Sequence, residues 1–203
     1  LAKLPKLEQI FEVSSPELRV RTTTSLEHAQ DVHAMCTQLL PELEAELGAA
    51  PTRRLQLFLF TARADYEATL DALGVGEHKL VAGVALPRPP VAMVCMEGMP
   101  EEIARGVILH ETTHLFTYAV SRSALPAWYS EGVADSFGGT GTYTWDGSKL
   151  TVKGFFDQAR IEALKPEGGT LPLRDFLEAN QFEQWRRGRE VGLAFYAQSW
   201  AFL

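Results

Sequence analysis

Hydrophobic and polar residues alternate in short runs over the first half of the chain. Residues 18–23 alternate and are rich in β-forming residues, so they predict a strand, and residues 55–60 predict a second one. Two further strands are predicted at 81–86 and 91–96, on either side of the proline-rich run 87–90. These four runs together predict a small mixed sheet.

Apolar residues at helical spacing fill the gaps between these strands. One predicted helix begins at a capping box formed by Thr24 and Glu27 and ends at Gly48, a residue type that commonly terminates helices. A second predicted helix runs from about 63 to 73 and ends at Gly74. The first half therefore combines helices with a sheet.

The second half of the chain reads mainly as helix. Pro100, followed by two glutamates, predicts a helix start, because proline suits the first helical turn and acids suit its dipole. This helix should run to about Val120, and another should run from near Pro126 to the glycine pair 138–139. A hairpin over 142–152 and shorter helices around 173–179 and from about 191 onward complete the prediction.

These elements predict an α+β fold. An N-terminal lobe (1–98) should hold the mixed sheet and its helices, and a mostly helical lobe (99–203) should follow, with the helix from Pro100 between them. The length of 203 residues suits a single domain of two such lobes. Because the chain starts without methionine and stops within an apolar stretch, we expect it to be a piece of a longer protein.

Composition and charge limit the classes of function that the chain could have. The net charge is −7 and no block of basic residues occurs, which argues against a nucleic-acid partner; Arg186, Arg187 and Arg189 read as a solvated helix end. No apolar run approaches the ~20 residues of a membrane span. Cys36 and Cys95 are too few for a disulfide framework. The chain contains no targeting segment, which leaves compartment and oligomeric state open and is compatible with an extracytoplasmic location.

The chemistry of the chain is concentrated in a His-Glu-x-x-His motif on the helix from Pro100. His110 and His114 are four residues apart, so they share one helix face and their imidazoles can bind one ion. Neutral imidazole suits zinc, and three protein ligands leave a position for water, whose pKa the metal lowers to about 7. Glu111 can reach that water and accept its proton at neutral pH.

A second acidic motif lies on the next predicted helix. His110-Glu111-x-x-His114 followed by Trp128-x-Ser130-Glu131-Gly132-x-Ala134 resembles the active-site core of the gluzincins, zinc peptidases whose third ligand is glutamate. The resemblance covers residues 100–138 and is nearest to bacterial gluzincin-like domains whose substrates are not settled. It implies that His110, His114 and Glu131 bind zinc and that Glu111 is the catalytic base.

Two further residues are candidates for the site. Asp135 lies one helical turn after Glu131, so its carboxylate could accept the outer ring N–H of a metal-bound histidine. Gluzincins commonly supply a tyrosine or histidine to stabilise the oxyanion, and no histidine follows His114. Tyr196 is therefore the candidate donor and Tyr143 the reserve. Tyr118 and Tyr129, beside the motif helices, read as core residues.

The sequence thus predicts zinc-dependent hydrolysis of peptide bonds in a peptide or protein substrate. An extended substrate could add to the strand at 91–96. Two alternatives stay open. One is a non-catalytic metal-binding module of the same fold, which a blocked pocket would support. The other is a metal-dependent hydrolase of a non-peptide substrate, which a closed apolar pocket would support.

Overall fold

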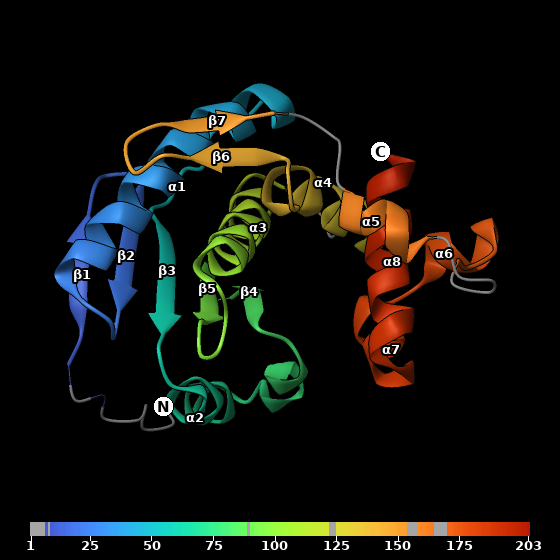
Figure 1. Cartoon of the computed structure of the whole chain (residues 1–203), viewed down its shortest axis with the longest axis horizontal. Helices are drawn as coiled ribbons and strands as arrows, with labels where there is room; N and C mark the ends of the chain where they lie inside the picture. The colour runs from blue at the N-terminus through green and yellow to red at the C-terminus, as the bar shows by residue number, and fades with distance from the viewer. Residues whose placement is uncertain (1–6, 8, 89, 122–124, 154–157, 165–169) are drawn as a thin grey trace.

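The α+β fold predicted from the sequence is confirmed in a computed structural model, which describes residues 7, 9–88, 90–121, 125–153, 158–164 and 170–203 (Figure 1). The N-terminal part consists of β1 (Phe11–Ser14), β2 (Leu18–Thr22), α1 (Leu26–Leu47), β3 (Leu55–Phe60), α2 (Arg63–Leu73), the 3-10 helix η1 (Gly76–Leu80), β4 (Gly83–Pro87) and β5 (Pro90–Cys95). The C-terminal part consists of α3 (Glu101–Val120), α4 (Ala127–Gly138), β6 (Tyr143–Trp145), β7 (Leu150–Val152), α5 (Gln158–Ala163), α6 (Leu173–Glu178), α7 (Gln181–Arg187) and α8 (Arg189–Phe202).

The main sheet is mixed and has five strands in the order β1-β2-β3-β5-β4. β2, β3 and β5 run parallel, and the outer strands β1 and β4 pair antiparallel with their neighbours. The prediction that the strand at 91–96 binds substrate is wrong, because β5 is hydrogen-bonded to β3 on one side and to β4 on the other. β4 is the edge strand on this side of the sheet and is the one that could accept another strand.

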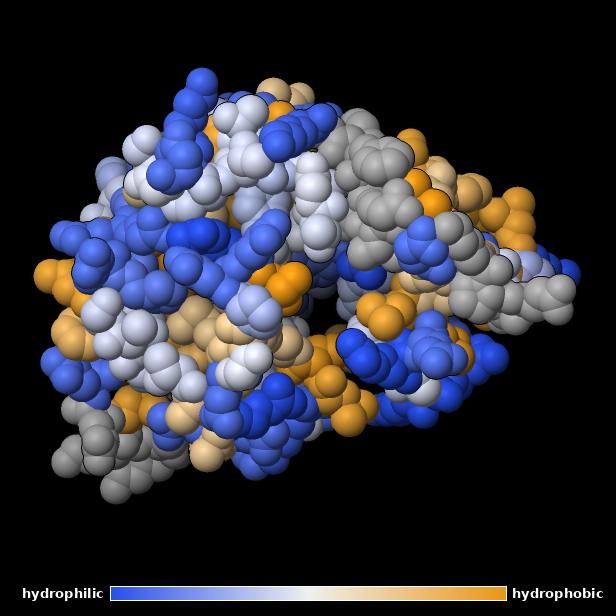
Figure 2. All heavy atoms as spheres, viewed as in Figure 1, coloured by the Kyte–Doolittle hydropathy of each residue, from blue (hydrophilic) through white to orange (hydrophobic). Residues whose placement is uncertain are grey.

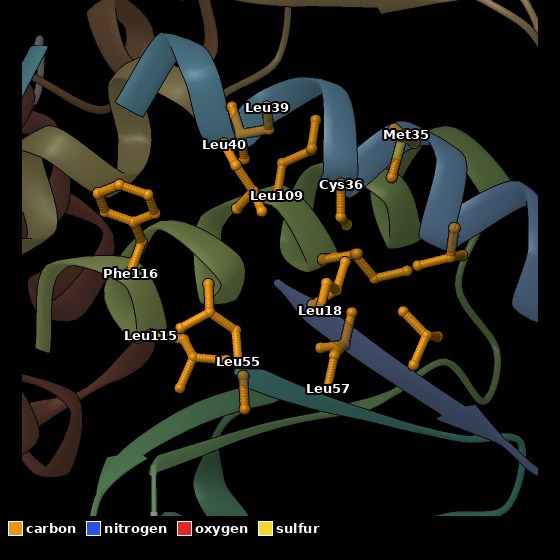
Figure 3. Close-up of a cluster of buried hydrophobic side chains, with 14 of the residues drawn as sticks. Leu18, Met35, Cys36, Leu39, Leu40, Leu55, Leu57, Leu109, Leu115 and Phe116 are labelled. Carbon is orange, nitrogen blue, oxygen red and sulfur yellow. The ribbon is translucent and has the colours of Figure 1, made fainter. Parts of the chain in front are cut away.

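Helices cover both faces of this sheet. Because side chains alternate along a strand, Leu57 and Leu59 of β3 face α1 and α3, whereas Phe60 faces α2 and packs edge-on against Tyr66. Figure 3 shows the first of these cores, where leucines of α1 and α3 meet those of β2 and β3. Cys36 is part of this core and is fully buried. This packing fixes α3 against the sheet.

Several boundaries differ from the sequence predictions. The cap of α1 is Ser25, whose hydroxyl accepts from the backbone N–H of His28, and the expected capping box of Thr24 and Glu27 does not form. β1, α5 and α7 were not predicted; each is short, and a short element carries too little periodicity to recognise. Residue 89 of the proline-rich run lies outside the described residues. Within the described ranges, no helix has the length and apolar character that crossing a membrane requires.

The C-terminal helices lie on the far side of α4 from the sheet (Figure 1). α8 packs closely on α4 at Gly132, where an added Cβ would lie 2.5 Å from the carbonyl oxygen of Ser199. Only glycine allows this approach of the two backbones. It brings Tyr196, one turn before Ser199 on α8, beside the two helices that carry the histidines and the glutamates.

Candidate metal centre

α3 carries three of the predicted site residues in its buried middle. His110 and His114 are one turn apart, and their Nε2 atoms lie 3.0 Å from each other. The threonines between and after them satisfy their own hydroxyls by donating to carbonyls one turn back, as Thr113 does to Leu109 at 2.9 Å. Because these hydroxyls are satisfied within the helix, the two imidazoles are the side-chain polar groups that α3 presents toward α4.

The third predicted ligand comes from α4. The Oε2 atom of Glu131 lies 3.2 Å from Nε2 of His114 and 3.3 Å from Nε2 of His110. The two helices meet at glycines: a Cβ on Gly138 would lie 2.5 Å from the carbonyl oxygen of Gly106 and 2.6 Å from the backbone nitrogen of His110. This close crossing brings the glutamate to the histidines.

Each histidine is oriented through its outer ring nitrogen. Nδ1 of His110 lies 3.1 Å from Oδ1 of Asp135, and Nδ1 of His114 lies 3.1 Å from the hydroxyl oxygen of Ser130. A proton on Nδ1 donates to either partner and leaves the lone pair on Nε2 for a metal. The position of Asp135 matches the one expected from its spacing to Glu131. Ser130 was missed, although it stands in the quoted motif.

The three donor atoms meet the geometric test for one bound cation. Their separations of 3.0 to 3.3 Å are close to the roughly 3.3 Å expected between ligands of a tetrahedral ion held at ~2.0–2.1 Å. Two imidazole lone pairs and a carboxylate oxygen repel one another at this range unless a positive charge lies between them. His110, His114 and Glu131 thus form a group that could hold a metal ion.

The electrostatics of the group also favour a positive charge. Burial alone would lower the pKa of His110, but its bonds to the carboxylates of Asp135 and Glu131 outweigh burial and raise that pKa to about 10. Burial would raise the pKa of Glu131, but the neighbouring His114 and His110 hold it well below its usual range. Without a metal, a proton takes the cation's place.

Glu111 stands apart from the three donors. Its side chain is buried at 7% exposure, and its Oε2 atom has no hydrogen-bond partner within the described residues. The carboxylate lies against Gly83 of β4, where an added Cβ would come within 2.6 Å of Oε1. Burial raises the pKa of Glu111, and the nearby His110 and His114 oppose that rise. A buried carboxylate without a partner, beside two histidines, is suited to accept a proton.

Tyr196 lies beside the metal-binding group. Its ring stacks on that of His110 with the centroids 5.9 Å apart, and the guanidinium of Arg160 lies over it at 5.5 Å. Burial raises the pKa of Tyr196 well above its usual value, so the hydroxyl stays protonated. The reserve candidate is engaged elsewhere, because the hydroxyl of Tyr143 donates to the carbonyl oxygen of Glu102 at 2.9 Å.

Two hollows of unequal size flank Glu111. The larger has a volume of about 540 Å³ and is lined by His110, Glu111 and Tyr196 together with apolar residues such as Val107. The smaller, of about 30 Å³, lies farther along β4 and is lined by Tyr118, which is half-buried and not the core residue that we expected. Figure 2 shows that the molecule is hollowed between its N-terminal part and its C-terminal helices. The site is therefore open chiefly on one side.

Comparison with known proteins adds no family assignment. No family model matches the chain, and no curated protein matches it. The resemblance to gluzincins stays a prediction, carried by the quoted motif residues. What the structure itself contributes is the convergence of His110, His114 and Glu131 from two helices.

Proposed function

We propose that this chain is a zinc-dependent hydrolase of peptide bonds. The observation that carries the proposal is the group formed by His110, His114 and Glu131, with the unpartnered carboxylate of Glu111 beside it in an open cavity. Two imidazoles and one carboxylate suit zinc, whereas calcium and magnesium prefer shells made of oxygen. His110, His114 and Glu131 would hold the ion, and the resemblance to gluzincins supports the same assignment.

Zinc at this position would polarise a substrate carbonyl and make water acidic enough to lose a proton at neutral pH. Glu111 accepts the proton of the attacking water as the water oxygen adds to the carbonyl carbon. The same carboxyl then gives the proton to the leaving amine nitrogen as the C–N bond breaks. Tyr196, which lines the same cavity, donates its hydroxyl proton in a hydrogen bond to the carbonyl oxygen as negative charge develops there.

The edge strand β4 favours a peptide as the substrate. Gly83 at its start lines both hollows, and Val84 and Ala85 line the smaller one, so the strand passes directly beside Glu111. An extended peptide can add to the open side of β4 through main-chain hydrogen bonds. A hollow of about 540 Å³ beside Glu111 argues against a blocked, non-catalytic module. A non-peptide hydrolase is the remaining alternative, since the smaller hollow leaves little room on one side.

Zinc content and peptide cleavage test the proposal together. Elemental analysis of the purified protein should find about one zinc per chain, and a peptide mixture read by mass spectrometry should be cleaved unless a chelator is added. The double variant His110→Ala, His114→Ala should lose the zinc. Zinc retained in full by this variant would refute the metal assignment.

A second variant separates binding from chemistry. Glu111→Gln should keep the zinc, because Glu111 is not a ligand, and turnover should fall by ~10²–10⁴-fold, as expected for a lost general base. Glu46→Gln, at an exposed position of α1, is the matched control and should change neither quantity. A Glu111→Gln protein that cleaves at the normal rate, or that loses its zinc, would contradict the role given to Glu111.

A further inference from the structure

The larger hollow beside Glu111 is shaped for part of a substrate. Its volume of about 540 Å³ falls within the range of small-ligand sites. Its wall is formed by residues of η1, β4, α3, α4, α5, α7 and α8. The wall is largely apolar and includes Leu80, Val81, Val107, Trp185 and Leu193.

Two of the charged residues that line this wall, Glu111 and Arg189, have no hydrogen-bond or ion-pair partner within the described residues. Asp135 bonds Nδ1 of His110 and accepts from Arg160 at 2.7 Å, and Glu111 is the proposed base. Arg189 is exposed and forms no ion pair or hydrogen bond in the part of the chain that the structure describes. An unpaired guanidinium on a cavity wall stands out in a chain with net charge −7.

The local fold holds Arg189 at this wall. It is the first residue of α8 and follows Gly188, whose φ of 140° makes the sharp turn from α7. α7 and α8 then pack together through Gly192, where an added Cβ would lie 2.6 Å from the ring of Trp185. Trp185, near the end of α7, and Arg189, at the start of α8, therefore line the cavity on either side of this turn. The reading of this arginine as part of a solvated helix end accounts for its exposure but not for its place beside the site.

Antiparallel pairing with β4 would set the direction of the substrate. Leu80 and Ala82 line only the larger hollow, Val84 and Ala85 line only the smaller one, and Val81 and Gly83 line both. A peptide that pairs antiparallel with β4 runs the opposite way, from the smaller hollow to the larger. Residues on the C-terminal side of the scissile bond would then occupy the larger hollow, where Arg189 lies.

We propose that Arg189 binds a carboxylate on the part of the substrate that follows the scissile bond. The proposal rests on the proposed function for the identity of the substrate as a peptide. Guanidinium binds carboxylate through two parallel N–H···O bonds, which gives both affinity and orientation. The apolar wall would hold an aliphatic or aromatic side chain beside that group. The carboxylate has two possible sources: the C-terminus of a peptide, or an aspartate or glutamate side chain.

Binding to the Glu111→Gln protein tests this selectivity without cleavage. Three peptides serve as probes for calorimetry: acetyl-Ala-Ala-Ala-Leu with a free carboxylate, its C-terminal amide, and the amide with glutamate replacing the leucine. At least one carboxylate-bearing peptide should bind about tenfold more tightly than the leucine amide, with a difference that shrinks in high salt. Preference for the free acid assigns the C-terminus as the source, and preference for the glutamate amide assigns the side chain.

Two further variants, made in the same background, locate the effect. Arg189→Gln should abolish the preference, whereas Arg186→Gln, at an exposed position of α7 outside the cavity wall, should retain it. Equal binding of all three peptides, binding of none, or a preference that survives Arg189→Gln would overturn the proposal. A wild-type protein that cleaves peptides without this preference refutes only the role of Arg189. A preference in a protein that neither holds zinc nor cleaves peptides refutes the proposed hydrolase and leaves the carboxylate site standing.

Discussion

Oδ1 of Asp135 lies 3.1 Å from Nδ1 of His110, and the same oxygen accepts from the guanidinium of Arg160 at 2.7 Å. This carboxylate is 1% exposed and comes from the helix that also carries Glu131. It holds the proton of His110 on Nδ1, which leaves Nε2 free to bind a cation. The arginine in turn offsets the negative charge that burial makes unfavourable.

Replacement of Asp135 by asparagine tests this relationship. Asp135→Asn retains the shape of the side chain but removes the charge that strengthens the bond to His110. Zinc affinity should fall by roughly 10–100-fold while the fold is retained, as measured by competition with a chromophoric chelator and by circular dichroism. Asp175→Asn, at an exposed position of α6, is the control. Equal zinc affinities for the two variants would show that the charge of Asp135 does not act through His110.

Tyr196 offers a test of the oxyanion contact. Tyr196→Phe removes only the hydroxyl and should retain the stacking of the ring on His110. Turnover should fall by an amount equivalent to about 2.7–4 kcal/mol in the activation free energy, with zinc content unchanged. Tyr143→Phe is the matched control, since its hydroxyl donates to the backbone of Glu102. Equal turnover by Tyr196→Phe and the wild type would return Tyr196 to a packing role.

The buried carboxylate of Glu111 should destabilise the metal-free protein at neutral pH. Its pKa is raised above the ordinary 4.5, so the folded state holds its proton more strongly than the unfolded state does. The contribution of Glu111 to the free energy of unfolding therefore falls as pH rises from 4.5 through the higher folded-state pKa. Below pH 4.5 the group is protonated in both states and the penalty disappears.

Glu111→Gln should accordingly stabilise the protein in the presence of a chelator. At pH 7 the free energy of unfolding should rise by about 1–3 kcal/mol, the cost of a buried polar group without a partner. At pH 4 the gain should vanish. Urea titrations at both values, with Glu46→Gln as the exposed control, measure the difference. Stabilisation of equal size at both pH values would mean that the charge of Glu111 is not its cause.

Local signals in the sequence were sufficient for much of the fold. β3 and α2 begin and end where predicted, because an apolar run broken only by Gln56 marks the strand and a terminal glycine marks the end of the helix. α5 and α7, of six and seven residues, were not predicted, because an element of at most two turns shows little periodicity; α6, which is equally short, was predicted around 173–179. The turn between α7 and α8, which brings Arg189 to the cavity, was missed for the same reason.

The residues of the candidate site also differ in whether a local pattern of the sequence predicts them. The positions of His110, His114 and Asp135 follow from helical spacing, which is a local property of the sequence. Ser130 and Arg160 were missed because their roles depend on contacts with side chains of other helices, which helical spacing within one element does not show. The identity of the edge strand was likewise predicted wrongly, since the pattern of 91–96 does not show that β4 pairs on its outer side.

The close crossing of α3 and α4 at Gly106 and Gly138 is another feature that no local pattern predicts. A methyl group added at Gly138 would lie 2.5 Å from the carbonyl oxygen of Gly106 and 2.6 Å from the backbone nitrogen of His110. Both contacts are to backbone atoms, which cannot rotate away, so the helices must separate. Because the histidines lie on one helix and Glu131 on the other, separation should spread the three donor atoms beyond their present 3.0 to 3.3 Å.

Gly138→Ala should therefore lower zinc affinity as well as stability. We expect a loss of about 1–3 kcal/mol in the free energy of unfolding, as for other overpacked cores, together with at least tenfold weaker zinc binding. Gly192→Ala is the matched control: its added Cβ would lie 2.6 Å from the ring of Trp185, between α7 and α8. That variant should lose comparable stability but retain its zinc affinity, because α3 and α4 are undisturbed. If both variants bind zinc equally well, the donors reach one another without help from the glycine crossing, and flexible side chains set the geometry of the centre.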